Sequence, residues 1–406
     1  MHNSARRPSD EFTFVSLFCG CGGLDYGFVQ AGFRCLAAFD SDPLALQAHH
    51  KAIRATTFEC DLSTGLLPYN YSQTPDVVLA GPPCQGFSTI GKRKIDDERN
   101  HLLVISAKIA VDLNPAVFIL ENVPAVRSGA HLKYWSKLEA VLTKAGYTCS
   151  TFSLKASDFG VAQIRKRIFL IATKPQMQMT FPTSQRRSAT LRDAIGDLAP
   201  GAPALNHRPT FLEPNEIAAR IARRIEPGKK LCNVRAGINC VHTWQIPEVF
   251  GKTTRSEREV LGALIRLRRR ERVRATGDAD PVLVSSVSRH ISRSAREDII
   301  SLIKKRYLRA TGGLVDFRQT FNGKFRRLSW DQVSFTVDTR FGDARNFLHP
   351  DQDRSFTVRE AARIQGFPDS FVFLGKDNDQ FRLVGNAVPP PVAKAIALRV
   401  FDVLRG

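Results

Sequence analysis

The sequence of 406 residues has no run of about 18 apolar residues, so it predicts no membrane-spanning helix. The opening stretch MHNSARRPSDEF lacks the apolar core of a secretory signal peptide. Eight cysteines are too few for a disulfide framework in so long a chain, and we expect reduced thiols. These absences predict a cytoplasmic protein, and a hydrophobic content of 43% predicts a folded one.

Metal ligands are also scarce. Cys19 and Cys21 flank a single glycine, which is a poor spacing for metal binding. Cys232, Cys240 and His242 form a loose trio, for which zinc is one interpretation and unpaired core or loop residues are the commoner one. We therefore expect no metal.

Acidic residues are in short supply in one part of the chain. The chain has 59 Lys and Arg against 39 Asp and Glu, a net charge of +20. Residues 176–330 hold 30 of the basic and 14 of the acidic residues, which is +16 of that excess. A solvated basic face is the simple explanation, but so uneven a distribution favours a polyanion partner, with nucleic acid the usual one.

Residues 12–174 alternate short apolar runs with amphipathic stretches. This rhythm predicts an α/β fold with a mostly parallel, Rossmann-like sheet and helices on both faces. Strands are expected at 12–18, 35–40, 76–81, 116–123 and 167–174, and helices at 24–33, 43–52, 102–113 and 134–146. Ligands bind beyond the carboxyl ends of strands in such sheets. Five notable residues follow expected strand ends and so predict one shared site: Gly20, Asp40, Asp61, Cys84 and Glu121.

The rhythm changes at residue 175. Ser-x-x-Glu at 256–259 and at 294–297 fits a capping box at the start of two helices, with a turn and a strand expected between them over 276–288. The second helix carries an apolar stripe of Ile299, Ile300, Ile303, Tyr307 and Leu308. Helix, strand and helix with basic flanks suit a small winged-helix or helix-turn-helix unit, and equally a packing subdomain without DNA contact.

Towards the C-terminus the sequence again shows the pattern of a folded helical segment. We expect a helix at 357–368 and a final amphipathic helix within 383–404 that packs on the first domain. The expected domains are 12–174, 175–330 and the returning segment 331–406.

The stretch GPPCQGFS at 81–88 places one thiol, Cys84, after a strand on a stiff Pro-Pro turn. A buried structural cysteine needs no such staging, whereas a nucleophile must be exposed and aimed.

Seven motifs in order together resemble the DNA (cytosine-5) methyltransferase family. They are SLFCGCGG (16–23), the strand ending at Asp40, GPPCQGFS (81–88), ENV (121–123), QIRKR (163–167), REAARIQGFP (359–368) and GNAVPP (385–390). The resemblance covers residues 13–174 and about 330–404, and it implies a class I methyltransferase fold with the target-recognition domain in the basic middle segment.

The resemblance implies a covalent mechanism. The thiolate of Cys84 attacks carbon 6 of cytosine, which makes carbon 5 nucleophilic enough to accept a methyl group. Glu121 holds nitrogen 3 and the exocyclic amine. Arg165 and Arg167 support the base and its carbonyl oxygen; phosphate binding or an ion pair to Glu121 are the alternatives for these arginines.

The implied methyl donor is S-adenosylmethionine. By resemblance, Phe18 stacks on the adenine, the glycines line the methionine part, Asp40 takes the ribose hydroxyls and Asp61 the adenine amine. The full expected set is Phe18, Gly20, Gly22, Gly23, Asp40, Asp61, Pro82, Asn386 and Val388. The family often has Asp in place of Ser16 and Glu in place of Asp40, and the second departure weakens the ribose assignment.

The implied partner is double-stranded DNA, from which the target cytosine must be flipped out. Segment 85–101 is polar and basic enough to close on DNA, and within it Gln85 and Ser88 are expected DNA contacts. Arg268, Arg269 and Arg270 are expected to lie along the phosphate backbone. We expect a monomer associated with the nucleoid. A cognate restriction endonuclease that acts separately is a possible partner, and the sequence does not say whether one exists. The rival interpretations are a tRNA methyltransferase of the same family and a catalytically silent DNA-binding regulator.

Overall fold

The computed structural model describes residues 11–68, 71–83, 97–175, 177, 179, 187–274 and 279–406. The chain forms two compact units. Unit 1 comprises residues 1–208, 331–340 and 357–406, and unit 2 comprises residues 209–330 and 341–356. Unit 1 therefore reaches 34 residues beyond 174, where the sequence rhythm changes, and a second excursion into unit 2 interrupts the returning segment.

Unit 1 is built on a seven-stranded sheet in the order β3-β2-β1-β4-β5-β7-β6. All its strand pairs are parallel except those that β7 makes with β5 and β6. The strands are β1 (Thr13–Leu17), β2 (Arg34–Asp40), β3 (Thr56–Glu59), β4 (Val77–Ala80), β5 (Val117–Asn122), β6 (Thr148–Lys155) and β7 (Lys166–Thr173). The mostly parallel α/β sheet expected from the sequence is confirmed. The two strands that the sequence did not predict, β3 and β6, are the edge strands, whose half-exposed residues show no continuous apolar run.

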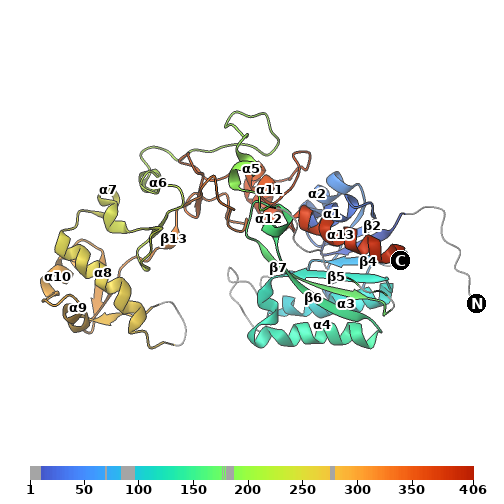
Figure 1. The fold of residues 1–406 in the computed structure, drawn as a ribbon, viewed down its shortest axis with the longest axis horizontal. Helices are drawn as coiled ribbons and strands as arrows, with labels where there is room; N and C mark the ends of the chain where they lie inside the picture. Colours follow the sequence, from blue (N-terminus) through green and yellow to red (C-terminus); the bar gives the residue numbers. More distant parts are fainter. Residues whose placement is uncertain are drawn as a thin grey trace, which may run out of the picture. The chain divides into compact units, whose positions relative to one another are not determined.

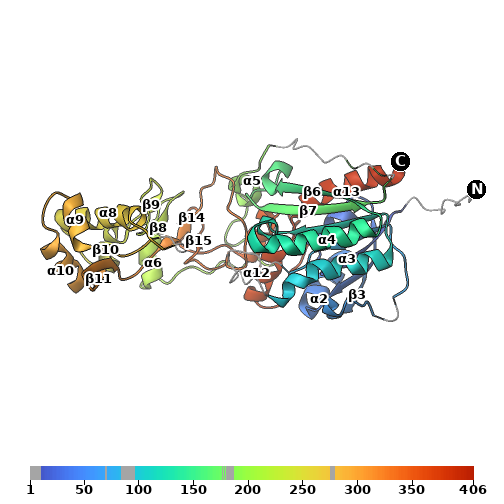
Figure 2. The ribbon, with the colours of Figure 1, turned by 90° about the horizontal axis from the view of Figure 1, so that it is seen from below.

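Helices cover both faces of this sheet (Figures 1 and 2). Alternate residues of each strand point to opposite faces, so that Val15 and Val78 face a core shared with α3 and α4, whereas Phe14 and Val77 face one shared with α1 and α13. The helices of unit 1 are α1 (Gly23–Val29), α2 (Pro43–Ile53), α3 (Leu102–Leu113), α4 (Leu132–Lys144), α5 (Leu191–Ile195), α11 (Val358–Ile364), α12 (Asp377–Asn386) and α13 (Pro390–Arg405).

The last helix returns to the first one, as the sequence predicted. A Cβ placed on Gly27 of α1 would lie 2.4 Å from the Cβ of Ala393 in α13, so the glycine allows the two helices to touch. The final helix expected within 383–404 is α13, which begins at Pro390; α12 ends at Asn386, because the prolines at 389 and 390 cannot continue it.

Unit 2 contains two clusters of buried residues. One is formed around the three-stranded sheet β13-β8-β9 with α6 and α7, and the other around α8, α9, α10 and the three-stranded sheet β10-β12-β11. The helices are α6 (Ile217–Ala222), α7 (Pro247–Phe250), α8 (Arg255–Arg270), α9 (Val284–His290) and α10 (Arg296–Lys304). The strands are β8 (Lys230–Cys232), β9 (Cys240–Val241), β10 (Val282–Leu283), β11 (Leu308–Thr311), β12 (Leu314–Phe317), β13 (Asn322–Lys324), β14 (Arg326–Arg327) and β15 (Phe347–Leu348).

Three sequence expectations for unit 2 need correction. The capping box of α8 is formed by Thr254 and Glu257, two residues before the predicted pair, because Thr254 is the residue with extended backbone. Helix α10 begins after Ala295 without a side-chain cap. Of the turn and strand expected over 276–288, only Val282–Leu283 form a strand, β10, and helix α9 begins at the next residue, Val284.

The apolar stripe predicted for α10 is also only partly buried. Ile299 is 3% exposed, but Ile300 is 46% exposed. Within the described parts of the chain, no helix is long and apolar enough to cross a membrane. No disulfide joins the seven described cysteines, which are all free.

Candidate active site

A cavity of about 260 Å³ opens in unit 1 beyond the carboxyl ends of β1, β2, β4 and β5. It has room for a ligand and not merely for one or two waters. Of the expected site residues, it brings together Phe18, Gly20, Gly23, Asp40, Pro82, Glu121, Arg165, Arg167, Asn386 and Val388. Of the five residues that the strand-end argument named, Gly20, Asp40 and Glu121 share this cavity with residues of the C-terminal segment; Asp61 does not line it, and Cys84 lies outside the described residues.

The glycine turn after β1 forms one wall. Gly20 has a φ of +55°, and a Cβ there would meet no atom within 4 Å, so its backbone is open to a ligand. Gly23 serves packing, because its Cβ would lie 2.4 Å from the carbonyl oxygen of Val388. Gly22 does not line the cavity; its Cβ would lie 2.7 Å from the imidazole of His49, and it allows the turn to pack on α2.

Phe18 precedes this turn in a strained conformation. Its φ is +52°, which is rare for an aromatic residue and found where the surroundings fix the backbone. A Cβ on Gly81 would lie 3.3 Å from the Phe18 carbonyl oxygen, so the turns after β1 and β4 touch. Phe18 lines the cavity.

Asp40 fixes the glycine turn. Its carboxylate accepts hydrogen bonds from the backbone N–H of Gly20 at 2.8 Å and of Asp42 at 3.0 Å. Burial raises the pKa of Asp40, although these N–H groups oppose the shift. Each carboxylate oxygen has a second lone pair, so a further donor from a ligand can still bind.

Two residues next to Asp40 were missed by sequence reasoning. Asp42 caps α2 and forms an ion pair with Arg382 of α12, and both line the cavity. The pKa of Asp42 is lowered because the bond and charge of Arg382 and the capping N–H groups outweigh its partial burial. A Ser-Asp-Pro sequence is a visible helix start, but nothing local links it to a residue 340 positions away.

Asp61 lies outside the cavity. Its carboxylate accepts bonds from the N–H and the hydroxyl of Ser63, at 2.9 and 2.8 Å, and caps a short 3₁₀ helix at Leu62–Thr64. These bonds lower the pKa of Asp61. The structure thus does not bring Asp61 together with the other expected residues.

Glu121, which is buried, forms an ion pair with Arg167, which is half-buried. Arg167 Nε lies 2.9 Å from Glu121 Oε1, and Glu121 is 9% exposed. Burial raises the pKa of Glu121, and the positive charges of Arg167 and Arg165 oppose part of the rise. Of the alternatives for the two arginines, the ion pair with Glu121 is the one that Arg167 makes.

Arg165 has a different role. Its Nη1 donates to the carbonyl oxygens of Val337 and Gly385, both at 3.0 Å, and the residue is 2% exposed. It thereby joins the strand region before β7 to the returning segment and to the GNAVPP turn. Asn386, the last residue of α12, and Val388 reach the cavity on this turn.

Asn122 is a further residue that sequence reasoning passed over. It ends β5 next to Glu121, and its Nδ2 donates to the carbonyl oxygen of Pro82 at 3.2 Å. Its Oδ1 accepts the N–H of Val123 at 2.8 Å. The amide therefore ties the Pro-Pro turn to the strand that carries Glu121. Cys84, Gln85 and Ser88 lie outside the described residues.

A buried polar cluster stands behind the glycine turn. Asp25 accepts bonds from the hydroxyl of Ser16 at 2.8 Å and from His49 Nε2 at 2.7 Å, and all three are at most 1% exposed. Ser16 and Asp25 also line the cavity. A carboxylate from α1 thus stands beside Ser16, where the family often has aspartate on the strand. Asp25, Cys35 and His49 each offer one possible metal-ligand atom, and these atoms lie within 4.8 Å of one another. Burial raises the pKa of the Cys35 thiol.

The arginines predicted to contact DNA are not equivalent. Arg268 is 6% exposed and forms an ion pair with Asp316 at 2.6 Å, so it holds α8 to β12 and is not free to bind a phosphate. Burial lowers its pKa despite the charge of Asp316. Arg269 and Arg270 are exposed on the last turn of α8. The expectation fails for Arg268 because position 268 belongs to the buried face of the helix.

The trio Cys232, Cys240 and His242 does not form a metal-binding group among the described residues. His242 Nδ1 contacts the carbonyl oxygen of Cys232 at 2.6 Å, and its ring stacks on Trp244 with 4.5 Å between centroids. These residues pack at the edge of the core of unit 2.

Comparison with known proteins accounts for this site. Residues 12–402 match the family model described as C-5 cytosine-specific DNA methylase. The chain is 30% identical to the type II methyltransferase M.AgeI of Thalassovita gelatinovora, over 94% of this chain and 97% of that protein. It is 31% identical to the type II methyltransferase M1.HphI of Haemophilus parahaemolyticus, over 95% of this chain and 85% of that protein.

Solved structures show the same fold. A prophage-encoded E. coli protein assigned as a DNA modification methyltransferase superposes with a TM-score of 0.59 at 23% identity, over 97% of this chain and 100% of that one. The Entamoeba histolytica methyltransferase EhMeth superposes with a TM-score of 0.52 at 13% identity, over 98% and 99% of the two chains. The chain belongs to the C-5 cytosine-specific DNA methylase family and is a DNA (cytosine-5-)-methyltransferase.

Proposed function

We propose that this methyltransferase transfers the methyl group of S-adenosylmethionine to carbon 5 of a cytosine flipped out of a specific duplex sequence, through a covalent adduct of Cys84 at carbon 6. The observation that carries the proposal is that Glu121, paired with Arg167, lines the same cavity as Pro82 and Pro83, the two residues that directly precede Cys84. A carboxyl group and a nucleophile at one site are what addition to a cytosine ring requires.

The cavity fits the proposed donor. The open backbone at Gly20, the ring of Phe18 and the carboxylate of Asp40 offer a close approach, a stacking surface and acceptors for hydroxyl groups. Asn386 and Val388 complete the wall. We assign these residues and Gly23 to the donor, leave Gly22 with packing only, and do not assign Asp61. When bound, the donor supplies an electrophilic methyl group on a sulfonium.

The protein residues carry the remaining steps. Cys84, as thiolate, forms a bond to carbon 6 of the base, and the electron pair of the ring's double bond moves towards carbon 5. Glu121, in its protonated form, donates to nitrogen 3 and offsets the charge that develops there. Arg167 keeps the carboxyl in place. After carbon 5 gains the methyl group, a water molecule takes the proton of carbon 5, whose electron pair re-forms the double bond to carbon 6. The bond between carbon 6 and the Cys84 sulfur breaks at the same time, the sulfur leaves as thiolate, and the aromatic ring is restored.

Unit 2 is the proposed reader of the DNA sequence. Its basic character and its exposed Arg269 and Arg270 suit the phosphate backbone, whereas Arg268 no longer belongs to this set. Gln85 and Ser88 remain proposed DNA contacts on the strength of the motif. We also propose a monomer that acts separately from any restriction endonuclease.

The covalent step can be tested with duplex DNA that carries 5-fluorocytosine at the methylated position. The wild-type protein should form a complex that survives denaturation, because a fluorine at carbon 5 cannot leave as a proton does. Cys84→Ser should form none while it still binds the donor. Trapping that persists in Cys84→Ser would remove Cys84 from the mechanism.

A further inference from the structure

The order of elements in residues 254–317 defines a recognisable motif within unit 2. Helix α8 is followed by the short strand β10, by α9 and α10, and by the hairpin β11–β12. The three strands form one antiparallel sheet in the order β10-β12-β11. This connectivity is that of a winged helix, and Figure 2 shows its helices and strands gathered together. A fold does not define a function by itself, so DNA binding has to be inferred from the residues on the surface of α10.

One side of α10 is buried and a second is bonded to α8. Ala295, Ile299 and Leu302 are at most 3% exposed and face the core. On the side towards α8, Ser301 donates to Glu257 at 2.7 Å, and Lys305, just after the helix, bonds the same carboxylate at 2.7 and 2.8 Å.

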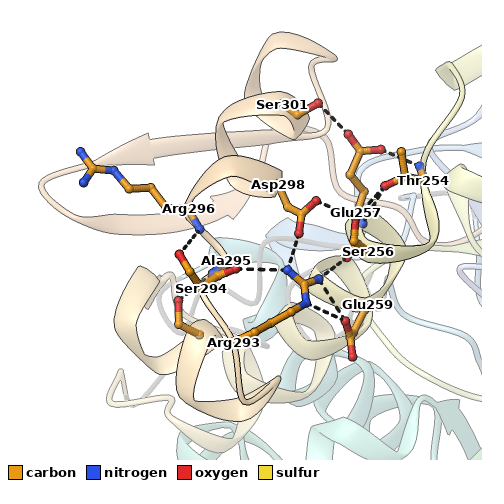
Figure 3. A network of polar contacts seen from close by, with 11 residues as sticks. Thr254, Ser256, Glu257, Glu259, Arg293, Ser294, Ala295, Arg296, Asp298 and Ser301 are labelled. Carbon is orange, nitrogen blue, oxygen red and sulfur yellow. Dashed lines mark hydrogen bonds and ion pairs between the residues drawn. The ribbon is translucent and has the colours of Figure 1, made fainter.

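Further contacts fix the start of α10. Ser256 donates to Asp298 at 2.8 Å, and Arg293 forms ion pairs with Asp298 at 2.7 Å and with Glu259 at 3.0 Å (Figure 3). The helix is therefore held on two sides, and its orientation relative to α8 is fixed. Within the described part of the chain, these contacts leave one side of α10 exposed.

That free side carries the exposed carboxylate of Glu297 and a row of three residues, Arg296, Ile300 and Lys304. Their spacing of four residues places them in one row along the helix. All three are exposed, and neither Arg296 nor Lys304 forms an ion pair with a described residue. Ile300 is 46% exposed and lies between these two cations, an arrangement that matches the major groove of duplex DNA, where phosphates flank thymine methyl groups.

The neighbouring hairpin and the charge of the motif fit the same partner. Gly312 and Gly313, between β11 and β12, have φ values of +58° and +77°, and a Cβ on either would meet no atom within 4 Å. Such a tip lets backbone approach a ligand closely. Residues 254–317 contain 15 Lys and Arg against 8 Asp and Glu, a net charge of +7.

We infer that α10 is the recognition helix of this methyltransferase and enters the major groove of its DNA target, with Arg296 and Lys304 on phosphates or guanine edges and Ile300 on base edges. The inference rests on the proposed function, in which unit 2 reads DNA. It goes further by naming the element and the residues that read.

Ile300 gives the sharpest test because it carries no charge. The full-length protein and duplexes with and without its methylated sequence would be compared by fluorescence anisotropy. Ile300→Ala should weaken binding to the target duplex about tenfold, as a lost base contact does, and leave other duplexes and the salt dependence unchanged. The matched control is Ile217→Ala on α6, which removes an isoleucine that is 64% exposed in the same unit and should change nothing.

The charged residues give a second test. Arg296→Gln combined with Lys304→Gln should reduce the slope of log affinity against log salt by about 1 to 2, since each lost phosphate contact removes about 0.9. Lys108→Gln combined with Lys137→Gln removes the same charge from exposed positions of α3 and α4 and should leave the slope unchanged.

The outcomes separate the inference from the proposed function. If wild-type protein with donor produces no 5-methylcytosine in duplex DNA, the proposed function fails. If the wild type methylates a defined sequence and both α10 variants bind and methylate it as the wild type does, the recognition helix is wrong and the proposed function stands. A tenfold loss for Ile217→Ala as well as for Ile300→Ala would also overturn the inference.

Discussion

The side-chain amide of Asn122 donates a hydrogen bond to the carbonyl oxygen of Pro82 at 3.2 Å. Asn122 is adjacent to Glu121 at the end of β5, and Pro82 belongs to the turn that leads to Cys84. One residue therefore couples the position of the carboxyl group to the turn that presents the proposed nucleophile. It acts by positioning and need not touch the substrate.

The isosteric change Asn122→Asp tests this coupling, because the carboxylate can still accept the N–H of Val123 but cannot donate to Pro82. We expect covalent trapping on 5-fluorocytosine DNA to slow at least tenfold while the affinity for S-adenosylmethionine, measured by calorimetry, stays within about twofold. Equal losses in trapping and donor affinity would show a general structural role.

Glu121 predicts a pH dependence. Burial raises its pKa above the ordinary value of 4.5, so the proton that it donates is present at low pH and is lost as the pH rises through the raised pKa. Glu121→Gln should slow methyl transfer by about 10² to 10⁴. The ratio of the wild-type single-turnover rate to the Glu121→Gln rate should fall with increasing pH, and dividing by the variant's rate cancels the opposite titration of Cys84.

The charge of Arg167 affects the pH at which this rate ratio falls. Its charge lowers the pKa of Glu121 relative to burial alone, so Arg167→Met should raise that pKa and move the fall in the rate to higher pH. Arg167→Lys keeps the charge and should leave the fall near its wild-type position. A profile that moves to lower pH in Arg167→Met would contradict the ion pair as the cause.

We expect a side chain at position 23 to impair donor binding for steric reasons. Its Cβ would lie 2.4 Å from the carbonyl oxygen of Val388, so Gly23→Ala must displace the wall of the cavity. We expect a loss of stability of about 1–3 kcal/mol in denaturant titrations and weaker donor binding. Gly201→Ala is the control, because its Cβ would meet no atom within 4 Å. Normal donor affinity in Gly23→Ala would show that this wall does not bind the donor.

We expect the charge of Asp25 to make the protein bind the donor more tightly than its product. Its buried carboxylate lines the cavity, and S-adenosylmethionine carries a sulfonium charge that S-adenosylhomocysteine lacks. Asp25→Asn should therefore weaken the donor several-fold more than the product. Ser16→Ala removes one hydrogen bond but keeps the carboxylate charge, and should preserve the ratio of the two affinities. A ratio unchanged in Asp25→Asn would refute an electrostatic role.

The sequence by itself determined the five inner strands of the sheet, the order of the motifs and the strand ends at which Asp40 and Glu121 lie. Continuous apolar runs report burial in central strands, and glycines and prolines report turns, because both effects act between near neighbours. Edge strands β3 and β6 escaped prediction because their residues are half-exposed and give no such run.

Only the tertiary structure decided which side chains meet. It paired Arg268 with Asp316, gave Arg165 the carbonyl oxygens of Val337 and Gly385, and left Asp61 outside the cavity. These partners, apart from that of Asp61, lie between 48 and 220 residues away in the sequence. The residues next to an arginine in the sequence look the same whether its side chain is buried in the core or exposed to solvent. The free row on α10 likewise appears only when the two other sides of that helix are filled, by the core and by α8.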